Sequence, residues 1–167
     1  TIMMGVVLYE SSSKRNAKTE ETLMESARDA NILQTISDNM EEAIFKSSVL
    51  NGFVYVNEAF ARMFGYESKE TILSTQPINL YNSKVERDLL LARVSRQGKV
   101  SNVLMSYRRE DGSSFWGRLS VSLISEEGGD FLVGTITDVT IQQEQNEQLQ
   151  ENEQQFRNAQ QLAKLGN

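Results

Sequence analysis

The chain has 167 residues, 39% of them hydrophobic and one of them proline, which is enough for one core with helical extensions. Its formal charge of −6 argues against a nucleic-acid partner, because phosphate binding needs a basic stripe and the Lys and Arg residues are scattered. The sequence holds no Cys and no His, which excludes disulfides, thiolate or imidazole metal sites, cysteine nucleophiles and imidazole general bases. The absence of Cys also agrees with a cytoplasmic location.

Residues 1–15 are interpreted as the tail of a preceding domain followed by a linker. The apolar run from Ile2 to Tyr9 is too short to span a bilayer, and its Val and Tyr content favours a final β-strand. The trailing end of a membrane helix is the alternative. Residues 11–15, three serines followed by two basic residues, are typical of a linker. No direct membrane contact is expected.

Residues 16–37 are predicted to form an amphipathic helix. Leu23, Ala27, Ala30 and Leu33 recur at helical spacing among charged residues, which gives this helix a narrow apolar stripe. Such a stripe is typical of a coiled-coil or docking contact.

Two strands are predicted next, one beginning at Ala43 and one over residues 53–56, with a turn between them. Three helices follow them, over residues 58–64, 68–73 and 83–98. The first and third have clear boundaries, with Asn57 and Ser83 as N-terminal caps and Gly65 and Gly98 as C-terminal ends.

Three more strands are predicted, over residues 100–108, 114–125 and 131–139. Asp111-Gly112 and Gly128-Gly129 lie between them and supply the positive φ angles that tight hairpins need. The order of two strands, a run of helices and a three-strand meander predicts the α+β class rather than a parallel doubly wound fold.

The last strand turns directly into a helix at the sequence Gly134 to Thr140. No Gly or Pro separates the two elements, so we expect a shift of the strand to pass to the helix. Thr140 and Gln143 fit a capping box, and Asp138 adds negative charge near the positive end of the helix.

The C-terminal helix, residues 141–167, is polar. Leu149, Phe156 and Ala163 fall seven residues apart, which predicts a weak coiled-coil seam. The alternative is a single solvated helix.

Four motifs resemble the PAS sensory domain, in its order and with its spacing. They are residues 52–60 (GFVYVNEAF), 63–66 (MFGY), 111–116 (DGSSFW) and 134–140 (GTITDVT). The resemblance covers residues 38–140. It implies a five-stranded antiparallel sheet of order 2-1-5-4-3, with short helices on one face forming a pocket and with N- and C-terminal helices on either side. It also implies that Asp138, Val139 and Thr140 pass signals to the C-terminal helix.

Both ends of the chain resemble further parts of such proteins. Residues 155–166 look like the entry to a second PAS domain, and Met4 to Leu8 look like the last strand of an earlier one. The sequence is therefore interpreted as one unit of a multi-domain signalling protein, a sensor histidine kinase or a diguanylate cyclase.

Strand alternation assigns two faces to the sheet. The candidate ligand-binding residues, expected on the helix-covered face and its helices, are Phe60, Phe64, Ile72, Leu104, Ser106, Leu119 and Ile136. A small apolar ligand or simple core packing fits this set. The outer face is expected to carry Met105, Tyr107, Trp116 and Val133, an apolar surface that predicts a docked helix or a homodimer.

No cofactor is expected. The usual haem needs a His, and dicarboxylate-sensing relatives present basic residues, whereas the inward positions here are aliphatic, Gly or Ser. This chain resembles the light-sensing flavin branch of the family around Tyr107 and Phe115-Trp116. That branch uses a pocket Cys, which this chain lacks. It also holds the flavin ring with amide side chains, and the corresponding residues here are Ser106, Gly117 and Ile136.

The predicted function is a non-catalytic sensory and dimerisation module that passes a conformational signal to its C-terminal helix. Its expected partners are a second copy, neighbouring PAS and output domains of the same chain and a small apolar ligand. A flavin-binding redox or light sensor without cysteine adduct chemistry and a passive spacer are the alternatives.

Overall fold

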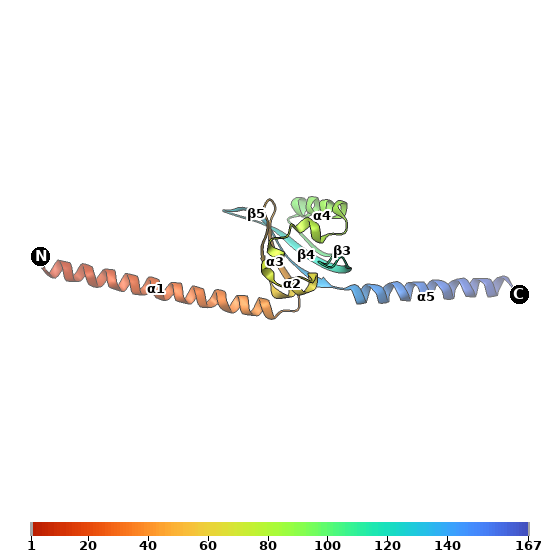
Figure 1. Cartoon of the computed structure of the whole chain (residues 1–167), viewed down its shortest axis with the longest axis horizontal. Coiled ribbons are helices and arrows are strands. Elements are labelled where there is room, and N and C mark those ends of the chain that lie inside the picture. Colours follow the sequence, from red (N-terminus) through yellow and green to blue (C-terminus); the bar gives the residue numbers. More distant parts are fainter. Residues whose placement is uncertain (1, 167) are drawn as a thin grey trace. The chain divides into compact units, whose positions relative to one another are not determined.

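A computed structural model describes residues 2–166 of the chain (Figure 1). The chain divides into two compact units, the first ending at Met40 and the second beginning at Glu41. Each unit is described by itself.

The first unit is one helix, α1 (Ile2–Asn39). The strand expected at residues 2–9 and the linker expected at residues 11–15 are therefore wrong, because both segments are helical. Ser11 and Thr19 stay within the helix by donating hydrogen bonds to the carbonyls of Leu8 (3.0 Å) and Arg15 (2.9 Å). The β-propensity of the valines is a weak preference that a continuous helix overrides.

None of the described side chains of α1 is buried within the chain. Among the described residues, no helix is both long enough and apolar enough to cross a membrane.

The second unit is built on one antiparallel sheet of order β2-β1-β5-β4-β3 (Figure 1). Its strands are β1 (Ala43–Ser48), β2 (Gly52–Val56), β3 (Lys99–Arg108), β4 (Ser114–Glu126) and β5 (Gly129–Asp138). Gly112 and Gly129 turn the two long hairpins with φ angles of 83° and 112°. The α+β class and the predicted strand order are confirmed.

Short helices connect β2 to β3. They are α2 (Glu58–Phe64), α3 (Lys69–Leu73), the 3₁₀-helix η1 (Pro77–Leu80) and α4 (Lys84–Gln97). The side chains of Asn57 and Ser83 accept hydrogen bonds from the third residues of α2 and α4, at 3.0 and 3.2 Å. Gly65 and Gly98 end these helices in the left-handed conformation, so the predicted boundaries are confirmed.

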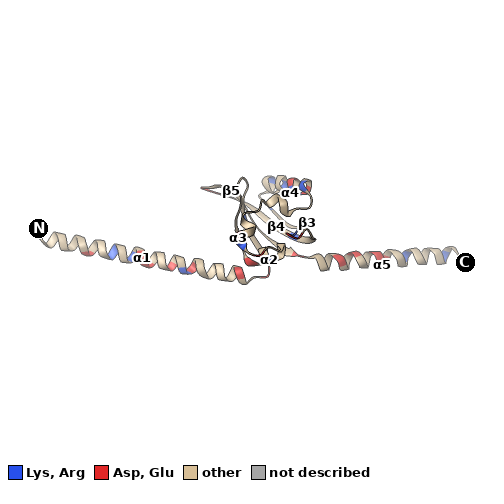
Figure 2. Cartoon of the chain, in the orientation of Figure 1, with Lys and Arg blue, Asp and Glu red and all other residues tan. Residues whose placement is uncertain are grey.

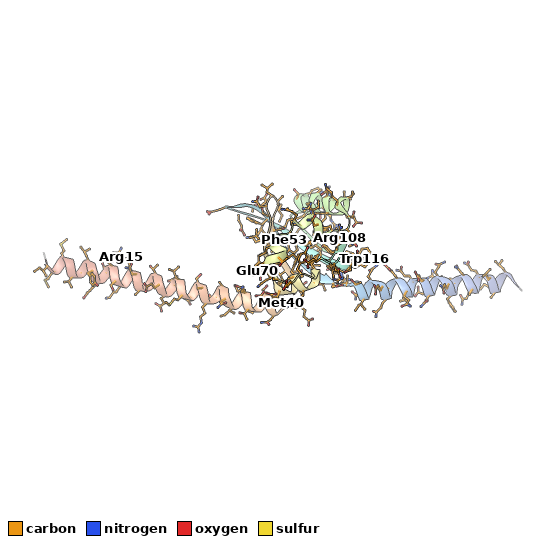
Figure 3. All side chains as sticks on the ribbon, in the orientation of Figure 1. Arg15, Met40, Phe53, Glu70, Arg108 and Trp116 are labelled. Atoms are coloured by element: carbon orange, nitrogen blue, oxygen red, sulfur yellow. The ribbon has the colours of Figure 1, made fainter. Side chains whose placement is uncertain are left out.

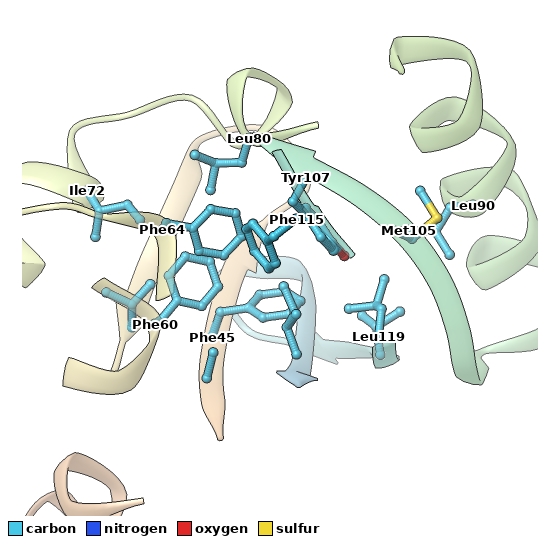
Figure 4. Packing of buried hydrophobic residues seen from close by; sticks show 14 of the residues in the cluster. Phe45, Phe60, Phe64, Ile72, Leu80, Leu90, Met105, Tyr107, Phe115 and Leu119 are labelled. Atoms are coloured by element: carbon cyan, nitrogen blue, oxygen red, sulfur yellow. The ribbon is translucent and has the colours of Figure 1, made fainter. Parts of the chain in front are cut away.

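The core lies between one face of the sheet and these helices (Figure 4). Aromatic rings form its centre: Phe60 stacks on Phe64 with 4.6 Å between ring centroids, and Phe64 meets Phe115 edge-on at 5.1 Å. Tyr107 stacks on Phe115 at 5.4 Å. Such pairs add roughly 0.5–1.5 kcal/mol each beyond the area they bury.

A β-bulge in β3 reverses the expected orientation of its side chains. Val100 pairs with Val121 and Val103 with Leu119, so β3 has one residue more than β4 between these pairs. Asn102, within the bulge, has a φ of 58°.

Beyond the bulge, Met105 and Tyr107 are buried in the core at 5% and 1% exposure, and Leu104 is 40% exposed. The predictions that Leu104 and Ser106 face inward and that Met105 and Tyr107 face outward are therefore wrong. Simple alternation failed because the extra residue shifts the period by one.

The C-terminal helix α5 (Thr140–Leu165) follows β5 directly and has no buried residue. Its acidic residues end at Glu153, and the basic residues Arg157 and Lys164 follow them (Figure 2). This distribution complements the helix macrodipole.

Candidate functional site

A cavity of about 50 Å³ lies between the inner face of the sheet, η1 and α4. We call it the inner cavity. Its walls are mainly apolar and include Phe45, Phe60, Phe64, Leu80, Leu90, Val94, Leu119, Val121 and Ile136, with Tyr81, Arg87 and Tyr107.

Four of the predicted ligand-binding residues line the inner cavity: Phe60, Phe64, Leu119 and Ile136. Ile72 is fully buried in the core away from it. Ser106 lies outside, where its hydroxyl accepts a hydrogen bond of 2.7 Å from the Asn82 amide. Sequence reasoning missed the wall that α4 supplies, although the spacing of Leu90 and Val94 already placed one face of that helix inward.

Tyr107 is the main polar group of the inner cavity that sequence reasoning missed. Its ring packs over Gly117, where a Cβ atom would meet the ring carbons at 2.6 and 2.7 Å. Gly117 therefore makes the space that Tyr107 occupies.

The Tyr107 hydroxyl is buried, and its hydrogen-bonding neighbour is the Tyr81 hydroxyl. Tyr81 lies beside it, with 5.1 Å between the ring centroids. Burial and the neighbouring Tyr81 raise the pKa of Tyr107 well above its ordinary value, so the phenol stays protonated.

Asp138, Val139 and Thr140 form a closely bonded junction between β5 and α5. One Asp138 carboxylate oxygen accepts hydrogen bonds from the Thr140 amide (2.9 Å) and the Thr140 hydroxyl (2.6 Å). The Thr140 hydroxyl in turn accepts one from the Trp116 amide (3.0 Å), and the Val139 amide donates to the Trp116 carbonyl (2.8 Å). The junction thus stays attached to β4.

The predicted capping box at Thr140 and Gln143 is wrong. Thr140 is the first helical residue, and the preceding residue, Val139, makes no side-chain cap. The Thr140 hydroxyl is occupied by β4, and the Gln143 side chain donates to Glu147 at 3.1 Å. Asp138 serves the helix start instead, because it accepts the Thr140 amide.

Arg109 connects this junction to the core. Its guanidinium donates to the Asp138 carboxylate at 2.8 Å and to the Met63 carbonyl, near the end of α2, at 2.9 Å. The same group lies 4.4 Å from the centre of the Phe115 ring. The sequence gives no local sign of this role for Arg109, because Asp138 lies 29 residues further along the chain.

The outer face of the sheet is less apolar than expected. Trp116 and Val133 lie on it, partly exposed, whereas Met105 and Tyr107 do not. Trp116 lies where α5 leaves the sheet (Figure 3). Arg118 also points outward, and its guanidinium donates to the Gln142 side chain at 3.3 Å.

Metal and flavin sites do not fit these residues. Within residues 2–166, no group of three or more His, Cys, Asp or Glu side chains could hold a metal ion. Pockets for larger ligands enclose roughly 300–1,000 Å³, far above the inner cavity, and Tyr107 fills the space over Gly117 that a ring system would need.

The PAS domain family matches residues 41–140. The chain therefore belongs to the PAS domain family, whose members are sensory modules.

Two curated relatives are kinases. The chain is 24% identical to sporulation kinase C of Bacillus subtilis (strain 168) over 131 residues, which are 77% of this chain and 31% of the kinase. It is 27% identical to the sensor histidine kinase TmoS of Ectopseudomonas mendocina over 149 residues, which are 82% of this chain and 15% of that protein. The chain thus spans less than a third of either relative.

Solved structures show the same fold. A PAS domain from a two-component sensor histidine kinase matches with a TM-score of 0.60 and 22% identity, covering 68% of this chain and 98% of that one. An RNA-binding light-oxygen-voltage receptor matches with a TM-score of 0.63 and 24% identity, covering 75% of this chain and 37% of that one.

Proposed function

We propose that the chain is the sensory and dimerisation module of a multi-domain signal-transduction protein, a sensor histidine kinase in the first place. A conformational change in the PAS domain passes through β5 to α5. The observation that carries this proposal is the bonded junction of Asp138, Val139 and Thr140.

The junction supports transmission because it couples three elements. Arg109 joins Asp138 to the end of α2 and to the core ring of Phe115. The same Asp138 carboxylate holds the first amide of α5. A movement of the inner-cavity wall at α2 or β4 therefore reaches the first turn of α5 through hydrogen bonds, without a flexible linker in between.

Dimerisation is supported by the apolar residues of α5. Leu149 and Phe156, seven residues apart, are 58% and 64% exposed. Two such helices pair their seams and cover these side chains. Neighbouring PAS and output domains of the same protein would then receive the signal as a change in how the two helices pair.

The test uses spin labels on α5. Because the chain has no Cys, Gln150→Cys supplies a single labelling site off the Leu149 and Phe156 seam. Electron–electron double resonance on the labelled chain should show one narrow distance between two copies. Asp138→Ala and Thr140→Ala should broaden it, while Ser125→Ala, at the far end of β4, should not.

Two results would contradict the proposal. If the chain stays monomeric at a concentration of about 100 micromolar, it has no dimerisation role. Distances that do not change in the Asp138 and Thr140 variants would leave the junction without a role in transmission.

The alternatives make different predictions. A flavin sensor would absorb visible light as purified. The inner cavity gives flavin binding little support, because Tyr107 occupies the space over Gly117. A passive spacer would show the same α5 distances whatever is changed in the inner cavity.

A further inference from the structure

The start of α1 exposes apolar side chains on every side of the helix. Each large apolar side chain of residues 2–9 is exposed, from 52% at Val6 to 86% at Ile2 and Met3. Successive residues are about 100° apart around a helix, so this run leaves no polar face. It also carries no charged residue before Glu10 (Figure 2). An apolar surface of this kind indicates an interaction site.

A single partner helix would cover only part of this apolar end. In a coiled coil each helix presents one stripe to its partner, and the opposite side stays in water. Met4 and Val6 lie about 160° apart around α1, so one helix cannot cover both. The hydrocarbon of a lipid bilayer can surround the whole end.

Basic side chains follow the apolar end. Residues 11–19 include Lys14, Arg15 and Lys18 and no acidic residue. Within residues 2–166, none of these three side chains forms an ion pair with a carboxylate. The Arg15 guanidinium donates a long hydrogen bond of 3.4 Å to the Ser11 carbonyl of its own helix. All three charges are therefore available to an external anion.

We propose that the start of α1 binds the surface of a bilayer that contains anionic phospholipid. Residues 2–9 enter the boundary between acyl chains and headgroups, and Lys14, Arg15 and Lys18 contact the lipid phosphates. This inference goes beyond the proposed signalling function. The expectation of no direct membrane contact rested on the length of the apolar run, which bears on crossing a bilayer but not on binding its surface.

The dimensions of α1 fit this placement. Residues 2–9 span about 12 Å, enough for the roughly 5–10 Å that interfacial helices penetrate. Tyr9 ends the run, and tyrosine favours the membrane–water boundary because its ring is apolar and its hydroxyl polar. Lys14 follows Tyr9 by about 7 Å along the helix, which places it among the headgroups.

The first polar residue after Glu10 is also adapted to this boundary. The Ser11 hydroxyl donates a hydrogen bond of 3.0 Å to the Leu8 carbonyl. Because this hydroxyl is already paired within the helix, bringing it near the acyl chains costs less than burying a free one.

The experiment measures co-sedimentation of the 167-residue chain with two kinds of vesicle. One contains phosphatidylcholine alone, and the other contains phosphatidylcholine with about one third phosphatidylglycerol. We expect saturable binding to the anionic vesicles, at least about tenfold tighter than to the neutral ones, since each basic residue near an anionic surface adds to the affinity. Sodium chloride at about 0.5 M should remove most of this difference, because it screens the charges.

Two leucines supply matched variants. Leu8 and Leu23 are 61% and 63% exposed on the same helix, and only Leu8 lies in the apolar end. Leu8→Gln should weaken binding to anionic vesicles by about tenfold, because it removes one leucine side chain from the lipid, and Leu23→Gln by less than about twofold. Both variants should unfold at the temperature of the parent chain, because α1 buries no side chain.

A second variant tests the charges. Lys14→Gln combined with Lys18→Gln should weaken binding to anionic vesicles by about tenfold or more and leave binding to neutral vesicles unchanged.

Three results would overturn the proposal. Absence of vesicle binding, or equal binding to both kinds of vesicle, removes the anionic lipid surface as the partner. Equal weakening by Leu8→Gln and Leu23→Gln shows that the apolar end is not the contact. Self-association that Leu8→Gln abolishes, without vesicle binding, identifies a second copy as the partner. None of these measurements depends on the α5 distances, so the proposed signalling function is tested separately.

Discussion

Gly117 and Tyr107 act as a pair at the centre of the site. The strand β4 passes directly under the Tyr107 ring at Gly117, and a methyl group there would meet the ring at 2.6 Å and the Ile136 side chain at 2.8 Å. Both neighbours are buried, so neither can move aside cheaply.

Gly117→Ala should therefore destabilise the chain by about 1–3 kcal/mol, the usual range for forcing an extra carbon into a packed core. Urea unfolding followed by Trp116 fluorescence measures the change. Gly128→Ala is the matched control, because its new methyl group would meet the Phe131 ring only at 3.4 Å in an exposed turn. Equal losses in both variants would show that the Tyr107 ring can shift.

The raised pKa of Tyr107 predicts a pH dependence of stability. A folded-state pKa above the ordinary value of 10.0 means that folding favours the protonated phenol. The stability that it contributes is complete below pH 10 and is lost as the pH rises toward the folded-state pKa.

Between about pH 9 and pH 11, one unit either side of the pKa of a free phenol, Tyr107→Phe should therefore lose less stability than the parent chain. Urea midpoints measure this loss. At pH 7 Tyr107→Phe should be about 1 kcal/mol less stable than the parent chain, because it loses the hydrogen bond to Tyr81. Parallel curves over this range would mean that Tyr107 ionises as freely in the folded chain as in the unfolded one.

Local patterns were enough for the boundaries of α2 and α4 but not for the start of α1 or for the faces of β3. Asn57, Ser83, Gly65 and Gly98 are read correctly because caps act within one turn of the chain. The inner and outer residues of β4 follow by alternation. Those of β3 do not, because the bulge near Asn102 depends on pairing with a strand that lies later in the sequence.

The bulge makes Asn102 the position that places Tyr107 inside. Its φ of 58° suits Asn or Gly but not a β-branched residue. The Asn102 amide also donates to the Ser120 hydroxyl at 3.2 Å, which holds the bulge against β4.

Asn102→Val should cost about 1–2 kcal/mol of unfolding free energy, since Val pays the left-handed penalty at this position. Asn102→Gly, the control, should be neutral or slightly stabilising because it adopts this φ without strain. Chemical denaturation of both variants checks the prediction. A Val variant as stable as the Gly variant would show that the bulge can relocate along β3.

The contacts between the β5–α5 junction and the rest of the sheet could not be predicted from the sequence either. The strand-to-helix turn is evident from residues 134–140, and two of the residues predicted to form the signal junction, Asp138 and Thr140, are hydrogen-bonded to each other. Their partners Arg109 and Trp116 come from the hairpin of β3 and β4. Such contacts depend on tertiary structure, which no local spacing encodes.

For the whole molecule, the proposed signalling role depends on the exposed apolar residues of the C-terminal helix. α5 buries no side chain within the chain, so its Leu149 and Phe156 contribute stability only when another surface covers them. Between them lie mostly Glu, Gln and Asn residues, which keep the seam weak. A weak seam is suited to a signal that changes helix pairing, because small energies shift its equilibrium.

This view predicts the result of placing a charge on the seam. Phe156→Glu should raise the dimer dissociation constant by at least about tenfold, a change of roughly 1.4 kcal/mol, because the charge must be desolvated between two helices. Gln154→Glu adds the same charge two residues earlier, off the seam, and should change it by less than about threefold. Sedimentation equilibrium measures both constants. If the two variants weaken the dimer equally, net charge rather than the seam governs association, and the change in helix pairing can no longer carry the signal.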